Sequence, residues 1–204
     1  MPETIDVHVN GSVATVTLNR PDAANAMSYQ MVEELIAYFE SIRENRAIRC
    51  VVIAAAGKTF CAGGDLKDMQ ADLGMTPDER AGLLARFDTM LQGVNDAPQV
   101  TVARVQGAAL GGGVGLVCVS DIAIASTAAS FSLTEVKLGL SPALISPYVI
   151  TRIGISQARR LMLTGARIDA DEALTCGLVH EVALPEMLDA RVNETVAQVL
   201  ACSP

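Results

Sequence analysis

Two glycine-rich segments and one glutamate are the residues of this chain whose types and spacing could do chemistry. The first segment is residues 60–65 (FCAGGD), the second is residues 107–115 (GAALGGGVG), and the acid is Glu135. Glycine lets a ligand approach backbone N–H groups without meeting a β-carbon. Two such segments, each ending a strand and opening a helix, can direct two N–H donors at one oxygen and so form an oxyanion hole. With a carboxylate nearby for proton transfer, this set indicates enolate chemistry on a carbonyl substrate.

Predicted strands lead into both glycine-rich segments. The apolar run 50–54 is typical of a buried strand and precedes the first segment, and the run 100–105 precedes the second. Further strands are predicted at 121–125 and from Phe131, just before Glu135. Near the N-terminus, Asn10-Gly11 predicts a hairpin turn between strands 7–9 and 13–18.

Helix signals alternate with these strands. Ser28 can cap a helix with apolar residues at helical spacing, and Thr76 with Glu79 predicts a capping box for a helix that ends near Asn95. After residue 140 the pattern is mostly helical. There Asp169 and Glu172 predict a second capping box, Gly177 a helix end, residues 178–182 a brief strand, and residues 185–202 a final helix. The alternation predicts an α/β fold in a single domain, 1–204.

Composition restricts the class of protein. Half of the 204 residues are apolar, 3% are aromatic, and the formal net charge is -8, which argues against a nucleic-acid surface. Five scattered cysteines without CxxC spacing indicate reduced thiols in a cytoplasmic protein. His8 and His180 lie far apart, so no metal site is predicted. No signal peptide or membrane-spanning stretch is evident.

Five motifs in register resemble the crotonase superfamily, also called the enoyl-CoA hydratase/isomerase family. They are residues 19–21 with 25–26 (NRP, NA), 60–66 (FCAGGDL), 107–113 (GAALGGG), 121–125 (DIAIA) and 163–165 (LTG). The resemblance implies a spiral of ββα turns over roughly 1–140 and a mostly helical C-terminal part over 141–204, which looks shortened beside relatives. It also implies a homotrimer or hexamer, and an acyl-CoA thioester as substrate with no separate cofactor.

The resemblance also assigns roles to individual residues. The backbone N–H groups of Ala62 and Gly112 are expected to form the oxyanion hole for the thioester carbonyl. Glu135 is expected to be the general acid/base. The alternative is a non-catalytic role, in which Glu135 lies at the surface and forms an ion pair with Lys137. Substrate contacts are expected along the first segment, at Ala62, Gly63, Gly64 and Asp65, as well as at Ala24 and Gly112. From the residues alone, Asp65 is better explained as the cap of a helix starting at Leu66.

One departure from the family pattern leaves the reaction open. Many hydratases carry a second glutamate at the position of Gly115, and here that acid is absent. A hydratase with one carboxylate, an isomerase that moves a double bond from C3–C4 to C2–C3, and a non-catalytic acyl-CoA-binding protein all fit. Residues 115–116 and 132–149 resemble the methylglutaconyl- or isohexenylglutaconyl-CoA hydratases. We therefore favour a lyase of fatty acid metabolism that hydrates an α,β-unsaturated acyl-CoA.

Overall fold

A six-stranded sheet forms the centre of the computed structural model, which describes residues 3–71 and 74–203. In spatial order its strands are β1 (Ile5–Asn10), β2 (Val13–Leu18), β3 (Cys50–Ala55), β4 (Val100–Val105), β6 (Ile122–Ser126) and β9 (Glu181–Ala183). The β1–β2 hairpin is antiparallel and the other neighbouring pairs are parallel. A second, three-stranded sheet pairs β5 (Ala109–Leu110), β7 (Ser130–Ser132) and β8 (Ile168–Asp169).

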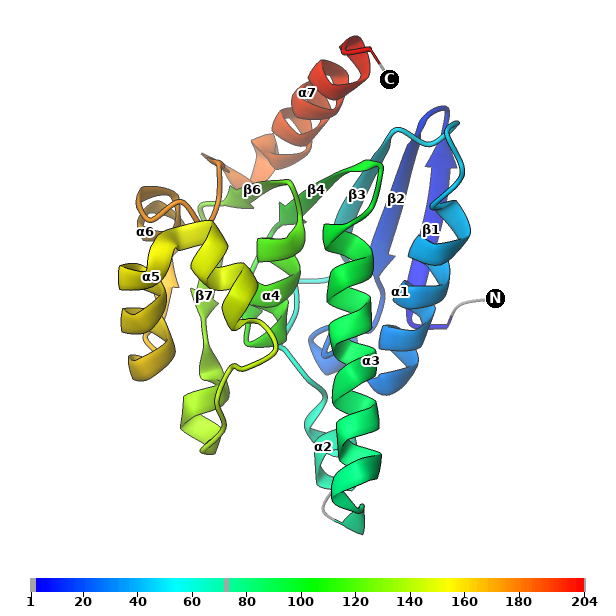
Figure 1. Ribbon diagram of the computed structural model, residues 1–204. Coiled ribbons are helices and arrows are strands. Elements are labelled where there is room, and N and C mark those ends of the chain that lie inside the picture. Colours follow the sequence, from blue (N-terminus) through cyan, green and yellow to red (C-terminus); the bar gives the residue numbers. More distant parts are fainter. Residues whose placement is uncertain (1–2, 72–73, 204) are drawn as a thin grey trace.

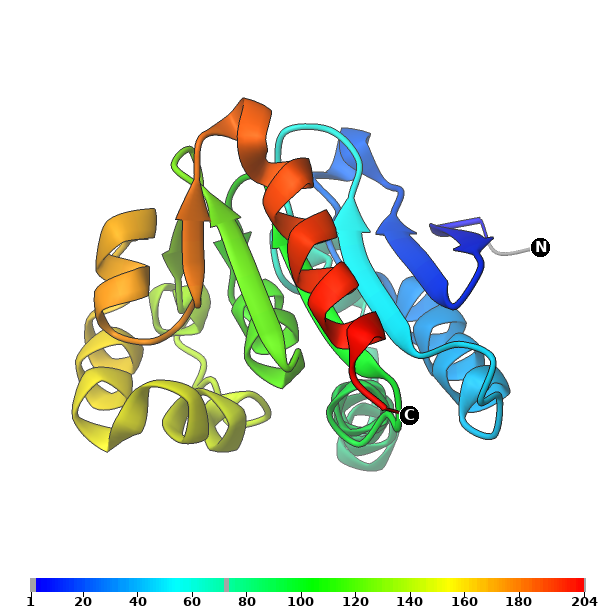
Figure 2. The ribbon, with the colours of Figure 1, turned by 90° about the horizontal axis from the view of Figure 1, so that it is seen from above.

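Helices cover both faces of the main sheet. Helices α1 (Tyr29–Ile42), α3 (Pro77–Asn95) and α4 (Gly112–Val119) lie on one face, and α7 (Leu188–Ala201) crosses the other (Figures 1 and 2). Helices α5 (Ser146–Thr164) and α6 (Ala170–Thr175) pack beside α4 and the small sheet. The short α2 (Leu66–Ala71) lies next to the start of α3 (Figure 1). This arrangement confirms the predicted α/β class.

The two-sided covering explains why strand β3 is apolar throughout. Every residue of β3 is buried, and its side chains alternate between the faces. Val51 and Ile53 join the larger cluster beneath α1, α3 and α4, whereas Cys50 and Val52 pack under α7. A strand that is buried on both faces reads as a continuous apolar run, as residues 50–54 do.

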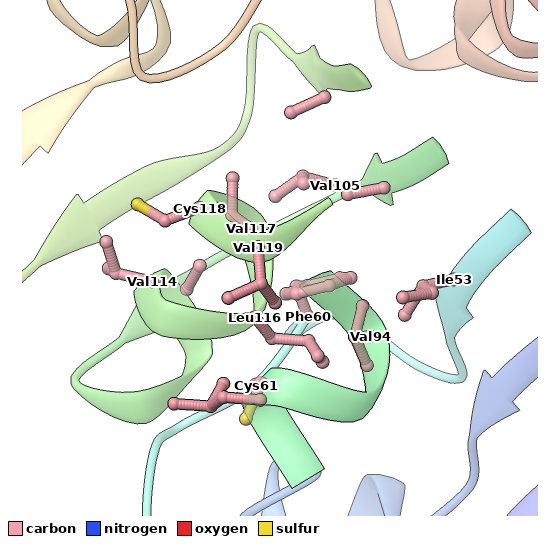
Figure 3. Close-up of a cluster of buried hydrophobic side chains, with 14 of the residues drawn as sticks. Ile53, Phe60, Cys61, Val94, Val105, Val114, Leu116, Val117, Cys118 and Val119 are labelled. Atoms are coloured by element: carbon pink, nitrogen blue, oxygen red, sulfur yellow. The ribbon is translucent and has the colours of Figure 1, made fainter. Parts of the chain in front are cut away.

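Helix α4 lies at the centre of the larger core. All eight of its residues are buried, and Figure 3 shows its side chains among those of the strands and of Phe60 and Cys61. Small residues at its N-terminus let the neighbouring backbone approach closely. A β-carbon on Gly113 would lie 2.6 Å from the Cys61 carbonyl oxygen. The fold therefore holds the start of α4 directly against the first glycine-rich segment.

Most local predictions are confirmed, with differences in the C-terminal part. The final helix predicted over 185–202 begins as a 3-10 turn, η4 (Pro185–Met187), and α7 starts at Leu188. The capping box of Thr76 and Glu79 is complete, but at α6 only half of the second box forms, because the Glu172 carboxylate pairs with Arg160. The predicted strand 178–182 is shorter, since Leu178 N–H donates to Ala173 at the end of α6 and the ladder begins at Glu181. None of the described helices is long and apolar enough to cross a membrane.

Candidate active site

A cavity of about 580 Å³ opens where the two glycine-rich segments meet. Its floor includes Gly63 and Gly64 from the first segment and Gly111 and Gly112 from the second, with Glu135 beside them. Apolar side chains from α2, from α3 and from residues 138–145 form much of the wall. They are Leu66, Met69, Leu83, Leu84, Phe87, Leu138, Leu140, Pro142, Ala143, Leu144 and Ile145, joined by Met27 and Val32.

Backbone pairing brings the two segments together. Cys61 forms an isolated parallel bridge with Ala109, and Leu110 N–H donates to the Cys61 carbonyl at 2.8 Å. Gly63 has a φ of +95° and packs so closely that a β-carbon there would lie 2.9 Å from the Leu110 carbonyl oxygen and 3.5 Å from the Gly112 nitrogen. Glycine is required at Gly63 for both its conformation and this approach.

Two amides at this junction are free to bind a ligand. Among the described residues, no acceptor faces the N–H of Gly64 or that of Gly112, and both residues line the cavity. Gly112 is the first residue of α4, where backbone N–H groups have no partner within the helix and the helix dipole is positive. Backbone donors of this kind can stabilise negative charge on an oxygen of a bound ligand.

The amide of Ala62 does not fit the role predicted for it. Its N–H donates to the carbonyl of Ala24 at 3.1 Å, so it is already used within the protein. Ala62 lines the cavity, but the free donor of this segment lies two residues further on, at Gly64. The Ala62 N–H is therefore not available to a ligand as predicted, and an oxyanion hole formed by this segment stays a prediction.

The opposite end of α4 is held by a cation. The Arg152 guanidinium donates to the carbonyls of Val117 and Cys118 at 3.1 Å each, and to that of Ser120. A positive charge at a helix C-terminus is favourable, and these bonds satisfy carbonyls that have no partner within the helix. Arg152 thereby fixes the helix that presents Gly112 to the cavity.

Glu135 lies in a short 3-10 helix, η3 (Thr134–Leu138), at the edge of the cavity. Its Oε2 atom is buried and has no hydrogen-bond partner among the described residues. Burial raises the pKa of the carboxyl above its ordinary value, although a hydrogen bond from its own backbone N–H acts in the opposite direction. The alternative pairing with Lys137 is not present among the described ion pairs. A carboxyl at the edge of a cavity, with one oxygen free of partners, suits proton transfer to a bound ligand.

The carboxylate that sequence comparison expects at Gly115 is replaced by an aliphatic side chain. A β-carbon on Gly115 would overlap Cγ2 of Ile145 and come within 3.7 Å of Leu91. Ile145 is buried and also lines the cavity. At this position the cavity therefore has an apolar wall where a second glutamate would stand, and Glu135 lines the cavity with the two free amides.

Asp65 and Ala24 have structural contacts of their own. Asp65 accepts from Lys67 N–H at 2.9 Å, as expected of a helix cap, and pairs with Arg20 at 2.8 Å. Burial acts to raise the pKa of Asp65, but these partners outweigh it and hold the pKa below its ordinary value. Ala24 does not line the cavity, and its carbonyl accepts the Ala62 N–H described above. The contacts predicted between these two residues and a substrate stay predictions.

Several residues of the site could not be anticipated from the motifs. The side chains of Phe87 and Met27 pack against Gly112. A β-carbon at position 112 would lie 2.7 Å from an atom of each of these side chains. Thr134 lines the cavity next to Glu135. Thr134 directly precedes Glu135 in the sequence. This adjacency to the predicted acid is the one sequence signal that could have indicated Thr134. Within residues 3–71 and 74–203, no cluster of His, Cys, Asp and Glu could hold a metal ion.

Comparisons with known proteins show the family of this chain. A family model described as enoyl-CoA hydratase/isomerase matches residues 8–204. A probable enoyl-CoA hydratase of Rhizobium meliloti is 39% identical over 187 residues, covering 91% of this chain and 71% of that protein. The 1,2-epoxyphenylacetyl-CoA isomerase of Escherichia coli is 32% identical over 206 residues, covering 100% and 78%. The solved structure of Pseudomonas aeruginosa AtuE has a TM-score of 0.97 at 46% identity and covers 99% of this chain and 79% of that one.

Proposed function

Because the chain belongs to the enoyl-CoA hydratase/isomerase family, we propose that it is a lyase that adds water to an α,β-unsaturated acyl-CoA thioester. The observation that carries this proposal is that two unbonded amides, Gly64 and Gly112, line one cavity with Glu135, whose Oε2 atom is buried without a partner among the described residues. Coenzyme A enters as part of the substrate, and the chemistry needs no further cofactor.

In the proposed reaction the thioester oxygen accepts hydrogen bonds from Gly64 and Gly112. Glu135 takes a proton from water as the water oxygen bonds to C3, and the C2=C3 electrons move toward the thioester oxygen. Glu135 then returns the proton to C2, which regenerates the carboxylate. Each amide donor is expected to contribute roughly 3 kcal/mol of transition-state stabilisation, and the carboxylate about 10²- to 10⁴-fold in rate.

The cavity wall supports an apolar acyl group as the substrate's variable part. Side chains from α3 and from residues 140–145 surround the space in front of Glu135, and most of them are aliphatic. Burying such a chain contributes about 0.8 kcal/mol for each CH₂ removed from water. We expect affinity to rise with chain length until the cavity is filled.

An isomerase is the second candidate, because Ile145 stands where a second carboxylate would be. Moving a double bond from C3–C4 to C2–C3 needs one base, which would carry a proton from C2 to C4. The same two amides would hold the enolate oxygen. Binding of acyl-CoA without turnover is the third outcome, and one set of assays separates all three.

The test follows the absorbance of the conjugated thioester with purified protein. Loss of absorbance from crotonyl-CoA supports hydration, gain of absorbance from a 3-enoyl-CoA supports isomerisation, and calorimetric binding without either supports a non-catalytic role. Glu135→Gln should abolish turnover and leave binding of the CoA ester intact. The matched control is Glu186→Gln, an exposed residue of η4 (Pro185–Met187), which should change neither. Near-normal turnover by Glu135→Gln would overturn the proposal.

We also propose a cytoplasmic homotrimer or hexamer that acts in fatty acid metabolism. Exposed aliphatic side chains on α5 support self-association, since Ile155 is 57% exposed and Leu163 is 72% exposed in the single chain. Sedimentation equilibrium of the purified chain tests this part independently. A monomer at micromolar concentration would contradict it.

A further inference from the structure

Thr134 is a polar residue of the cavity that the reaction described above does not use. It is the first residue of η3, directly before Glu135, and it lines the cavity with Gly111 and Gly112. Within the described part of the chain, its hydroxyl has no hydrogen-bond partner. A hydroxyl can donate one hydrogen bond and accept two, so it is available to a small ligand.

The Thr134 hydroxyl and the Glu135 carboxylate both lie close to Gly111. The position that a β-carbon would occupy on Gly111 lies 3.1 Å from Oε1 of Glu135 and 3.3 Å from Oγ1 of Thr134. Gly111 N–H donates to the Ser132 carbonyl at 2.8 Å, which holds the loop before η3 against the start of α4. With φ at +49° and no side chain, Gly111 leaves both oxygens open to the cavity beside the Gly112 amide.

In a hydratase with one carboxylate, a second polar group beside it can orient the attacking water. The wall at Gly115 cannot supply it, since Ile145 fills that space. We propose that the Thr134 hydroxyl and Glu135 Oε1 together hold the water molecule that attacks C3. This inference rests on the proposed hydration reaction and adds a catalytic residue to it.

The hydroxyl takes part without a net change of its own protonation. The water donates one hydrogen bond to Glu135 Oε1, and the Thr134 hydroxyl contacts the water through a second hydrogen bond. The water loses its proton to Glu135 as the C3–O bond forms, and Glu135 delivers that proton to C2. Thr134 orients the water and keeps its own proton throughout. Fixing a reactant in this way raises the rate of the step it enters and leaves binding of the acyl-CoA unchanged.

The experiment separates attack by water from proton transfer at C2. Hydration is measured with crotonyl-CoA, and proton transfer is measured as exchange of the C2 protons of butyryl-CoA with deuterium oxide, which needs Glu135 and the two amides but no water nucleophile. Thr134→Val keeps the size of the side chain and removes the hydroxyl. We expect its hydration kcat to fall about tenfold or more, with KM and C2 exchange unchanged. Thr134→Ser should restore hydration, whereas Glu135→Gln should abolish both rates.

Controls make each outcome decisive. Thr127→Val removes an exposed hydroxyl remote from the cavity and should leave hydration unchanged. Wild-type hydration by Thr134→Val, or an equal loss of hydration and C2 exchange, would overturn the role of Thr134. If Thr134→Val does not fold, Thr134→Ala replaces it. This variant also removes the hydroxyl, and the same kinetic result is expected. Absence of hydration in the wild-type protein would instead refute the proposed function, which keeps the two failures distinct.

Discussion

Gly113→Ala provides a direct perturbation of the distance between the two glycine-rich segments. The added methyl would lie 2.6 Å from the Cys61 carbonyl oxygen and 2.9 Å from its Cβ, and Cys61 leads into the segment that ends at Gly64. Ordinary contact begins at 3.4 Å, so α4 and this segment must separate by about 0.8 Å. The obstacle is backbone, which cannot move aside as a flexible side chain would.

A separation of this size is larger than an oxyanion hole tolerates. An N–H···O distance of about 2.9 Å would lengthen to a value at which the hydrogen bond is lost. Loss of one donor lowers kcat by about 10²- to 10³-fold, and overpacking lowers the free energy of unfolding by roughly 1–3 kcal/mol. We therefore expect Gly113→Ala to fold, to melt several degrees lower, and to hydrate crotonyl-CoA at least a hundredfold more slowly.

The matched control is Gly82→Ala in the exposed part of α3. A β-carbon on Gly82 meets nothing within 4 Å, so the substitution should leave kcat unchanged and raise the free energy of unfolding by up to about 1 kcal/mol. Steady-state kinetics and thermal unfolding followed by circular dichroism check both variants. Wild-type kcat in Gly113→Ala would refute the reasoning that contact between the segments sets the oxyanion hole.

Three further predictions follow from burial. Burial raises the pKa of Glu135, so between about pH 4.5 and the folded-state pKa the wild type releases this proton on unfolding and loses stability as pH rises. The free energy of unfolding of Glu135→Gln should therefore gain on that of the wild type across this range and keep a constant difference above it; urea midpoints that differ equally at every pH would contradict this. Gly115→Ala should lower the free energy of unfolding by about 1–3 kcal/mol, and this loss should shrink in an Ile145→Ala background, as a double-mutant cycle would measure. Under native conditions Ellman's reagent should modify the exposed Cys202 rapidly and leave three buried thiols unmodified until unfolding, because burial raises their pKa. These are Cys50, with a pKa of about 11, and Cys61 and Cys118, each with a pKa of about 12.

The sequence was sufficient where local rules decide the structure. The apolar run 50–54, the Asn10-Gly11 turn and the Thr76 capping box each form as expected, because turn, cap and burial preferences act over a few residues. The glycine-rich segments and Glu135 also meet in one cavity. Resemblance to a family supplied that juxtaposition, since local rules do not bring together segments about 45 residues apart.

The remaining features depend on tertiary contacts that no local pattern encodes. Successive backbone N–H groups of a loop face different directions. The sequence of residues 60–65 therefore does not reveal that the Ala62 N–H donates to the Ala24 carbonyl while the Gly64 N–H stays free. Ile145 lies 30 positions after Gly115, and only the path of the chain before α5 brings its side chain to that site. In the same way, the ion pair between Arg20 and Asp65 joins two distant loops.

The central claim is that the amides of Gly64 and Gly112 bind one thioester oxygen within reach of Glu135. A crystal structure of the protein with a bound acyl-CoA thioester tests it most directly. We predict the thioester oxygen at about 2.7–3.1 Å from both amide nitrogens, with the C2 atom facing the Glu135 carboxylate. A thioester oxygen bound away from these two nitrogens, or a Glu135 side chain turned from C2 toward solvent, would contradict the account.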